Sequence, residues 1–179
     1  MSKICVIGSS SMDLVVTSKK RPKAGETVLG DSFQTVPGGK GANQAVAAAR
    51  LGAEVYMVGC VGDDHYGKAI LDNLKANGVL TDYVEPVTGT ESGTAHIVLA
   101  DGDNSIIVVK GANDHVTPDY VKRALPAVQQ ADIVLIQQEI PEAPSIMSAG
   151  CANRSALPCC SIRRRRGRSA RKRSKMRRT

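Results

Sequence analysis

Unbroken apolar runs alternate with helical patterns along most of the chain. Three short runs are apolar at nearly every position, which is typical of strands buried on both faces of a parallel sheet; they cover residues 3–8, 54–59 and 131–137. Apolar residues at helical spacing predict three helices between and after these strands, over residues 42–51, 65–77 and 118–128. Thr117 is the predicted N-cap of the last helix. Asp63 and Asp64 are predicted to cap the start of the second helix, and Gly78 ends it.

Two other segments have the pattern of hairpin strands. The first contains Leu14 and Val16, then Thr27 and Leu29, and the second, residues 94–109, consists of two apolar runs separated by a polar turn. Strands that alternate with helices predict an α/β fold with a doubly wound, mostly parallel sheet. The extra strands predict a small antiparallel β lid over the carboxyl ends of that sheet, where such folds bind ligands.

Charge divides the chain near residue 150. Residues 1–150 carry 12 basic and 17 acidic side chains, whereas residues 151–179 carry 12 basic side chains and no carboxylate. The net charge of +7 therefore originates in the tail alone. Any function inferred from the charge of the whole chain would be a property of that tail.

Composition excludes several classes of protein. An apolar content of 42% suits a globular core, and no apolar stretch approaches the roughly 20 residues of a membrane helix. The N-terminal run stops at Gly8 without a signal-peptide pattern, so we expect a cytoplasmic protein. Five cysteines at irregular spacing match neither a disulfide framework nor a metal site, and no metal ligands are predicted.

The segment PGGKGANQ, residues 37–44, opens directly into a predicted helix. Adjacent glycines let the backbone approach a ligand closely, and the first N–H groups of a helix donate to oxygen-rich molecules. Lys40 and Asn43 add side-chain donors. The spacing fits neither a Walker A loop nor a dinucleotide-binding fingerprint. On the glycines alone, a tight structural turn remains an equal alternative.

With its sequence context, this segment resembles the N-terminal signature of ribokinase-type carbohydrate kinases. The resemblance rests on GGKGANQAVAAARLGAEVYMVGCVG at residues 38–62 and extends to IGSSSMDLV, PKAGETVLG, VGDDHYG, ESGTAHIVL, VKGAN and QQEIP. It covers residues 1–142, which we take as the N-terminal part of a ribokinase-like domain that includes the β lid. The remaining residues, 143–179, form a basic tail that we expect to be disordered.

The resemblance implies an ATP-dependent kinase that converts D-ribose to ribose 5-phosphate. The sugar-binding positions that it implies are Ser11, Asp13, Gly39, Lys40, Gly41, Asn43 and Glu139. A carboxylate can accept hydrogen bonds from two neighbouring sugar hydroxyls, and the lysine and asparagine can donate to others. The family usually has Asn where Ser11 stands. Two residues also have structural alternatives: Asp13 as a solvated loop carboxylate and Glu139 as a helix cap.

The resemblance also implies ATP and Mg²⁺ as cofactors, a monovalent cation in the full-length enzyme, and a homodimer formed through the β lid. In the family, the glycine-rich anion hole and the catalytic aspartate lie in the C-terminal half, and no G-A-G-D-like sequence occurs here. We therefore expect a truncated enzyme without a catalytic residue in this chain and without turnover on its own. A catalytically dead sugar-binding fragment is the alternative.

The tail suggests a change of reading frame. Back-translation of CCSIRRRRGR with chosen synonymous codons, read two nucleotides later, yields Leu, Leu, Asn, Pro, Ala, Pro, Ala, Arg, the strand that follows in the family. The hypothesis places the frame change between about residues 143 and 150. A nucleic-acid-binding arm is the alternative. Its arginines would bind phosphates non-specifically, because no aromatic residue is present for base stacking.

Overall fold

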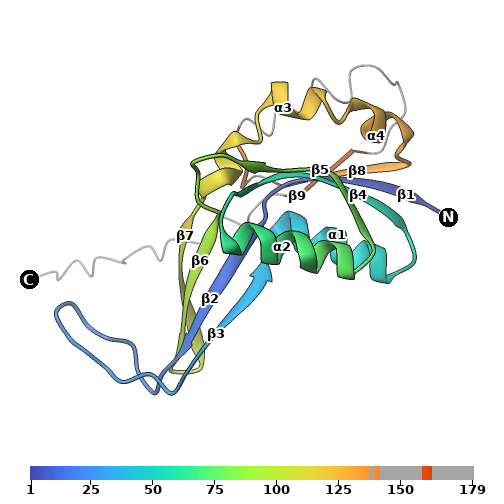
Figure 1. Cartoon of the computed structure of the whole chain (residues 1–179). Coiled ribbons are helices and arrows are strands. Elements are labelled where there is room, and N and C mark those ends of the chain that lie inside the picture. Colours follow the sequence, from blue (N-terminus) through green and yellow to red (C-terminus); the bar gives the residue numbers. More distant parts are fainter. Residues whose placement is uncertain (138, 142–158, 163–179) are drawn as a thin grey trace, which may run out of the picture.

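A five-stranded parallel sheet forms the centre of the computed structural model, which describes residues 1–137, 139–141 and 159–162 (Figure 1). Its strand order is β5-β4-β1-β8-β9, and every neighbouring pair is parallel. The strands are β1 (Lys3–Ile7), β4 (Glu54–Gly62), β5 (Val79–Val87), β8 (Ile133–Gln137) and β9 (Cys159–Ile162). We call this sheet the core sheet.

Helices cover both faces of the core sheet, as Figure 1 shows. On one face, α1 (Lys40–Arg50) and α2 (His65–Ala76) bury Ala45 and Leu74 against alternate strand residues such as Val6. On the other face, η1 (Gly111–His115), α3 (Pro118–Lys122) and α4 (Leu125–Gln130) pack against the intervening residues. Successive strand residues point to opposite faces, so this burial of both sets confirms the predicted doubly wound α/β fold.

Two of the predicted helix starts are confirmed, but one helix is divided. Thr117 caps α3 by accepting a hydrogen bond from the Tyr120 N–H. Asp64 caps α2 in the same way and accepts from the Gly67 N–H. The single helix predicted over residues 118–128 is wrong, because α3 ends at Lys122 and α4 begins at Leu125. Pro126 lacks the N–H that would continue the first helix and fits only the first turn of a new one.

The lid is a second sheet with strand order β3-β2-β6-β7. It consists of β2 (Ser11–Thr17), β3 (Ser32–Gly38), β6 (Thr94–Ala100) and β7 (Asp103–Val109). The pairs β2–β3 and β6–β7 are antiparallel, but β2 and β6 run parallel, so the lid sheet is mixed. The second lid strand also begins later than the sequence predicts, since Thr27 and Leu29 precede β3 and Leu29 is exposed.

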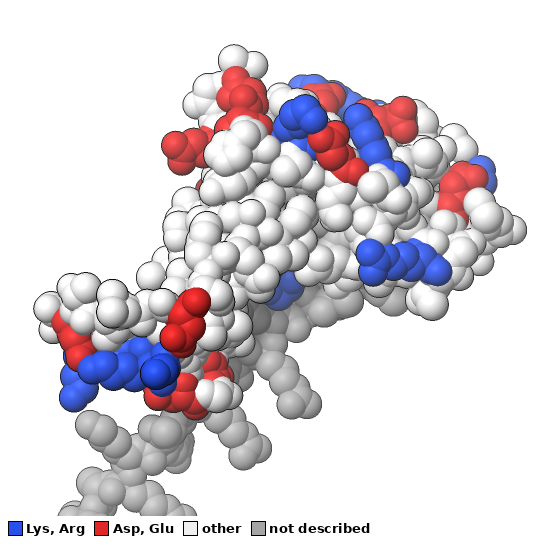
Figure 2. Space-filling model, turned by 60° about the horizontal axis from the view of Figure 1, so that its bottom comes forward, with Lys and Arg blue, Asp and Glu red and all other residues white. Residues whose placement is uncertain are grey.

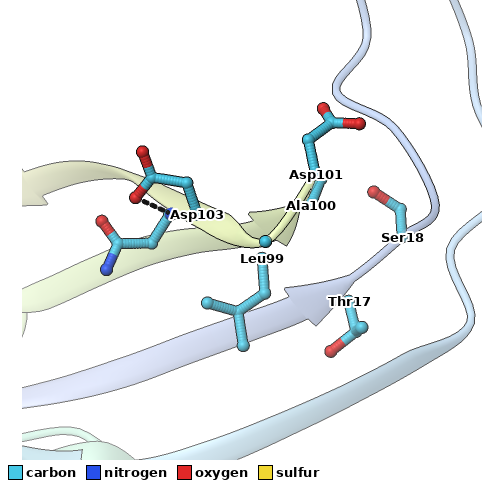
Figure 3. Close-up of a pocket in the computed structure, with 8 residues that line it drawn as sticks. Thr17, Ser18, Leu99, Ala100, Asp101 and Asp103 are labelled. Atoms are coloured by element: carbon cyan, nitrogen blue, oxygen red, sulfur yellow. Dashed lines mark hydrogen bonds between the residues drawn. The ribbon is translucent and has the colours of Figure 1, made fainter.

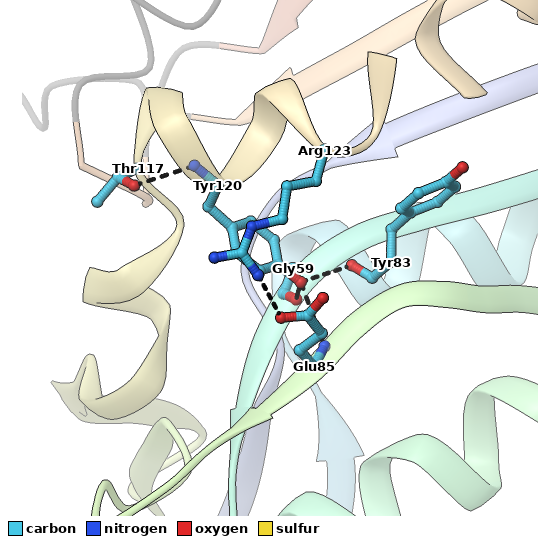
Figure 4. A network of polar contacts seen from close by, with 6 residues as sticks. All are labelled: Gly59, Tyr83, Glu85, Thr117, Tyr120 and Arg123. Carbon is cyan, nitrogen blue, oxygen red and sulfur yellow. Dashed lines mark hydrogen bonds and ion pairs between the residues drawn. The ribbon is translucent and has the colours of Figure 1, made fainter. Parts of the chain in front are cut away.

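Tyr120 ties the outer helices to the core sheet (Figure 4). Its buried hydroxyl shares one hydrogen between the carbonyl oxygens of Gly59, at 2.8 Å, and Tyr83, at 2.9 Å. The same oxygen accepts from the Glu85 N–H at 3.2 Å. Arg123 lies over the Tyr120 ring and forms an ion pair with Glu85. Burial raises the pKa of Tyr120, so the hydroxyl stays protonated and can donate.

Candidate functional site

The turn between β1 and β2 meets the start of α1. Gly39, the N-cap of that helix, has φ +94°, and a Cβ there would lie 2.7 Å from the Cα of Ser10. A Cβ on Gly41 would lie 2.7 Å from the carbonyl carbon of Gly8. Ala42 N–H donates to the Ser9 carbonyl at 3.0 Å. Any side chain at either glycine would therefore push the helix start away from the turn, which explains the glycines of the PGGKG segment.

Lys40 and Glu139 meet beside this turn. The lysine Nζ lies 2.6 Å from Oε1 of Glu139. Ser9 Oγ donates to the other carboxylate oxygen, Oε2, at 3.1 Å. The Glu139 side chain is thus fixed by two partners, and its carboxylate faces the same space as the first turn of α1. Any helix that Glu139 could cap lies outside the described residues.

Asp13 approaches from the lid side. It is a half-buried residue of β2, not a loop carboxylate, and Ser11 Oγ donates to its Oδ1 at 3.3 Å. Burial raises the pKa of Asp13, and the nearby charge of Glu139 adds to this shift, while the Ser11 hydrogen bond and the charge of Lys40 oppose it. A carboxylate with raised pKa accepts hydrogen bonds readily because it is poorly solvated.

These side chains line a pocket of about 140 Å³ between the lid sheet, the start of α1 and Glu139. Every predicted sugar-binding residue except Gly41 contributes to the lining, and Gly41 lies buried at the helix start. The lid adds an apolar wall that the sequence analysis did not identify. The complete lining is Ser11, Asp13, Gly39, Lys40, Asn43, Ala95, Ile97, Ile106, Val108 and Glu139.

The sequence analysis also missed Ser9, which holds Glu139. A serine next to a glycine has no distinctive signal, because its function depends on a residue 130 positions away. The lid wall had a weak signal. Ala95 and Ile97 alternate with polar or outward residues in β6, but alternation alone does not show which face meets a ligand.

A larger hollow of about 460 Å³ lies at the far end of the lid sheet (Figure 3). Thr17, Ser18, Asp101 and Asp103 are among the residues that line it, and Figure 3 shows that their side chains do not converge on one point. No lysine or arginine of the described residues is among its lining. The smaller pocket is the better candidate site, because there a cation, two carboxylates and an amide converge.

Charge on the described surface is mixed in sign. On the face in Figure 2, acidic and basic side chains lie next to one another at both ends of the molecule, with an uncharged area between them. Within residues 1–137, 139–141 and 159–162, no group of three His, Cys, Asp or Glu side chains could hold a metal ion. None of the described helices is long and apolar enough to cross a membrane.

The fold and the pocket define the class of the protein: a doubly wound α/β domain with a sheet-type lid over a polar site. A family model described as pfkB family carbohydrate kinase matches residues 1–168, and the chain belongs to this family. This confirms the resemblance inferred from the PGGKGANQ segment and its context.

Individual relatives agree with this assignment. The chain is 80% identical to a ribokinase of Bacillus subtilis over 142 residues, which are 79% of this chain and 48% of that protein. It is 43% identical to a deoxyribokinase of Salmonella typhi over 138 residues, 76% of this chain and 45% of that protein. Among solved structures it is similar to Arabidopsis thaliana ribokinase complexed with ribose and ATP, with a TM-score of 0.75 and 38% identity, covering 90% of this chain and 53% of the other. The chain thus spans about half the length of the relatives it matches.

Proposed function

We propose that this chain forms the sugar-binding part of a ribokinase-type kinase and binds D-ribose or a related pentose in the lid-covered pocket. The observation that carries the proposal is the convergence of Asp13, Lys40, Asn43 and Glu139 on that pocket. Two carboxylates can accept from several hydroxyls of one sugar, while the ammonium and the amide donate to others. The pocket is also smaller than the 300 Å³ or more, roughly, of drug-sized sites, which suits a monosaccharide.

The apolar wall supports the same ligand class. Ala95, Ile97, Ile106 and Val108 present carbon atoms opposite the polar side chains. A furanose or pyranose ring has hydroxyls at its rim and C–H groups on its faces, so one polar side and one apolar side match it. Ser11 keeps its hydroxyl on Asp13 and fixes the orientation of that carboxylate. In this proposal Ser11 orients Asp13, in addition to its own contact with the sugar.

For the whole protein we propose phosphorylation of the primary hydroxyl of ribose by ATP, with Mg²⁺ on the phosphates and a monovalent cation as activator. The described residues do not themselves fit ATP–Mg²⁺, because none of them form a metal-ligating cluster and the polar pocket is sugar-sized. We therefore derive no step through the nucleotide. Transfer of the phosphoryl group requires residues other than the described ones.

Calorimetric titration of the full chain with D-ribose tests sugar binding. We expect saturable heat at millimolar sugar or below, with a much weaker affinity in Asp13→Asn and an unchanged affinity in the matched control Asp31→Asn, whose side chain is exposed outside the pocket. Absence of heat in the unaltered chain would contradict the proposal. A parallel assay with ATP, Mg²⁺, K⁺ and ribose is expected to show no ribose 5-phosphate. Titration with 2-deoxyribose decides between the two sugars.

A second copy of the chain is the proposed partner of the lid sheet. By strand register, Val36, Ile106 and Val108 lie on the face of this sheet that also lines the pocket, and they are 43%, 49% and 53% exposed, so the proposed partner would pack beside the pocket. Apolar side chains this exposed on both outer strands of the sheet favour burial against another apolar surface. The lid face therefore supports a homodimer.

For residues 143–179 we propose an origin in a shifted reading frame. The proposal is supported by the absence of any acidic side chain after residue 150 and by the family-like strand that a shifted frame yields with chosen synonymous codons. Nucleotide sequencing of this region is the test, and a continuous in-frame gene without the alternative strand would contradict it. Any binding of this tail to RNA is then expected to be non-specific and to weaken steeply with salt.

A further inference from the structure

The chain passes between the core sheet and the lid sheet four times, and the crossings meet at one place. The crossing residues are Ser10 before β2, Gly39 after β3, Gly93 before β6 and Lys110 after β7. A Cβ on Gly39 would lie 2.7 Å from the Cα of Ser10, and one on Gly93 would lie 3.0 Å from its carbonyl oxygen. We call these four residues the lid joint.

Asn113 in η1 holds the lid joint together. Its Oδ1 accepts from the Ser10 N–H at 2.8 Å, and its Nδ2 donates to the Ser10 carbonyl at 2.7 Å and to the Lys110 carbonyl at 2.9 Å. The side chain is only 4% exposed. A side-chain amide has one acceptor oxygen and one nitrogen with two hydrogens, and in Asn113 both the oxygen and the nitrogen form hydrogen bonds. Aspartate would keep the acceptor but lose both donors.

Gly93 completes the arrangement around this amide. A Cβ on Gly93 would collide with Nδ2 of Asn113 and lie 2.9 Å from the Lys110 carbonyl oxygen. The Gly93 carbonyl accepts from the Met12 N–H at 2.8 Å, which couples the starts of β2 and β6. Asn113 is therefore bonded to two of the crossings and packed against a third.

We propose that Asn113 is a positioning residue that sets the inclination of the lid sheet over the pocket. Lys40, Asn43 and Glu139 belong to the core side of the pocket, whereas Asp13 and the apolar wall belong to the lid. A rotation at the lid joint moves the second group relative to the first. Asn113 itself does not line the pocket. The predicted effect of Asn113 on sugar affinity depends on the proposed function, whereas its predicted effect on the position of the lid sheet does not.

A buried asparagine could instead stabilise the whole fold without any special effect on the lid. Asn77 provides a matched control for that role. Its side chain also accepts one hydrogen bond, from Arg50 Nε at 2.8 Å, and donates to a backbone carbonyl, that of Asn73, at 2.7 Å. Asn77 follows α2 at its C-terminal end, and its bonds involve neither lid strands nor the joint.

The experiment compares hydrogen exchange and sugar binding in the full chain and in Asn113→Ala, Asn113→Asp, Gly93→Ala and Asn77→Ala. We expect the three joint variants to accelerate amide exchange in β2 and β6 at least tenfold more than in β1 and β4. In Asn77→Ala, amide exchange in β2 and β6 should not accelerate more than in β1 and β4. We further expect D-ribose dissociation constants at least tenfold higher in the joint variants and within twofold of the unaltered chain in the control.

Each outcome decides the proposal. Equal acceleration of lid and core amides in the joint variants overturns it, and so does unchanged exchange in the lid. Lid-specific exchange with an unaltered ribose affinity also overturns it, because the inclination would then not matter to the pocket. If the unaltered chain does not bind ribose at all, the proposed function fails, while lid-specific exchange still supports the role of Asn113 in the joint.

Discussion

Lys40 and Glu139 are 99 residues apart in the chain and form an ion pair in the pocket, with Nζ 2.6 Å from Oε1. The two residues come from the start of α1 and the segment after β8, so their contact depends on β1 and β8 being neighbours in the core sheet. Without a ligand, each charge satisfies the other. In the proposed complex, a sugar hydroxyl shares these partners.

Replacement of Lys40 by methionine tests the importance of this pair. Loss of a hydrogen bond to a charged group costs about 1.5–3 kcal/mol, which corresponds to roughly a ten- to hundredfold weaker affinity for ribose. Calorimetric titration gives the affinity. Lys68→Met is the control, since Lys68 pairs with Asp72 on the exposed face of α2. An unchanged affinity in Lys40→Met would exclude a direct contact between Lys40 and the sugar.

Sugar affinity is expected to fall on acidification. Burial raises the pKa of the Asp13 carboxyl above its ordinary value, and hydrogen bonds from sugar hydroxyls favour its ionised form. Binding is therefore strongest above that raised pKa and weakens as pH falls through it. Titrations from pH 7 downward measure the effect. A weak-binding Asp13→Asn variant should lack this acidic transition, and an identical pH profile in both proteins would assign the transition to another group.

Ser10→Ala is expected to stabilise the protein. The Ser10 hydroxyl is fully buried and has no hydrogen-bond partner among the described residues. Burying such a group costs about 1–3 kcal/mol, so its removal raises the free energy of unfolding by about 1 kcal/mol. The midpoint of urea unfolding measures the change. A lower midpoint would mean that the hydroxyl has a partner in solution.

Tyr120→Phe is expected to destabilise the fold by about 1–3 kcal/mol. The change leaves the Glu85 N–H and the carbonyls of Gly59 and Tyr83 without the hydroxyl that joins them. Urea unfolding again gives the free energy. Tyr66→Phe is a suitable comparison, because Tyr66 belongs to α2, on the other face of the core sheet, and is not part of this network. Equal effects of both substitutions would refute the role of the Tyr120 network.

The proposed homodimer predicts different effects for the two faces of the lid sheet. By strand register, Val36 and Phe33 point to opposite faces, and both are exposed. Val36→Glu should place a charge in the interface and yield monomers in sedimentation velocity, whereas Phe33→Glu should leave the dimer intact. If only Phe33→Glu dissociates the dimer, the interface lies on the opposite face of the lid sheet. If the unaltered chain is itself monomeric, the homodimer proposal is wrong.

The sequence predicted the elements that depend on local signals. Apolar runs identified β1, β4 and β8, and a polar side chain before a helix identified Asp64 as a cap. The strand β5 was missed because Asp82, Glu85 and Pro86 are poor strand formers, and an edge strand tolerates such a proline. β9 lies within the segment assigned to the basic tail, whose other residues are outside the described ones.

The residues of the candidate site also differ in whether the sequence alone could identify them. Asp13, Lys40, Asn43 and Glu139 could be named because they belong to segments that resemble a family, and the structure brings them to one pocket. Ser9 could not be named, since its bond to Glu139 depends on the pairing of distant strands. The side chains of the apolar lid wall depend on which face of a mixed sheet turns toward α1, and strand alternation leaves that choice open.

If the lid joint acts as proposed, the second sheet has a single pivot instead of four independent hinges. The lid sheet then rotates as one body, so Asp13 and Ile106 move together relative to the core sheet. Escape of a bound sugar is then an all-or-none event, with one relaxation time in a stopped-flow experiment. A lid anchored at separate points would instead open strand by strand and give several.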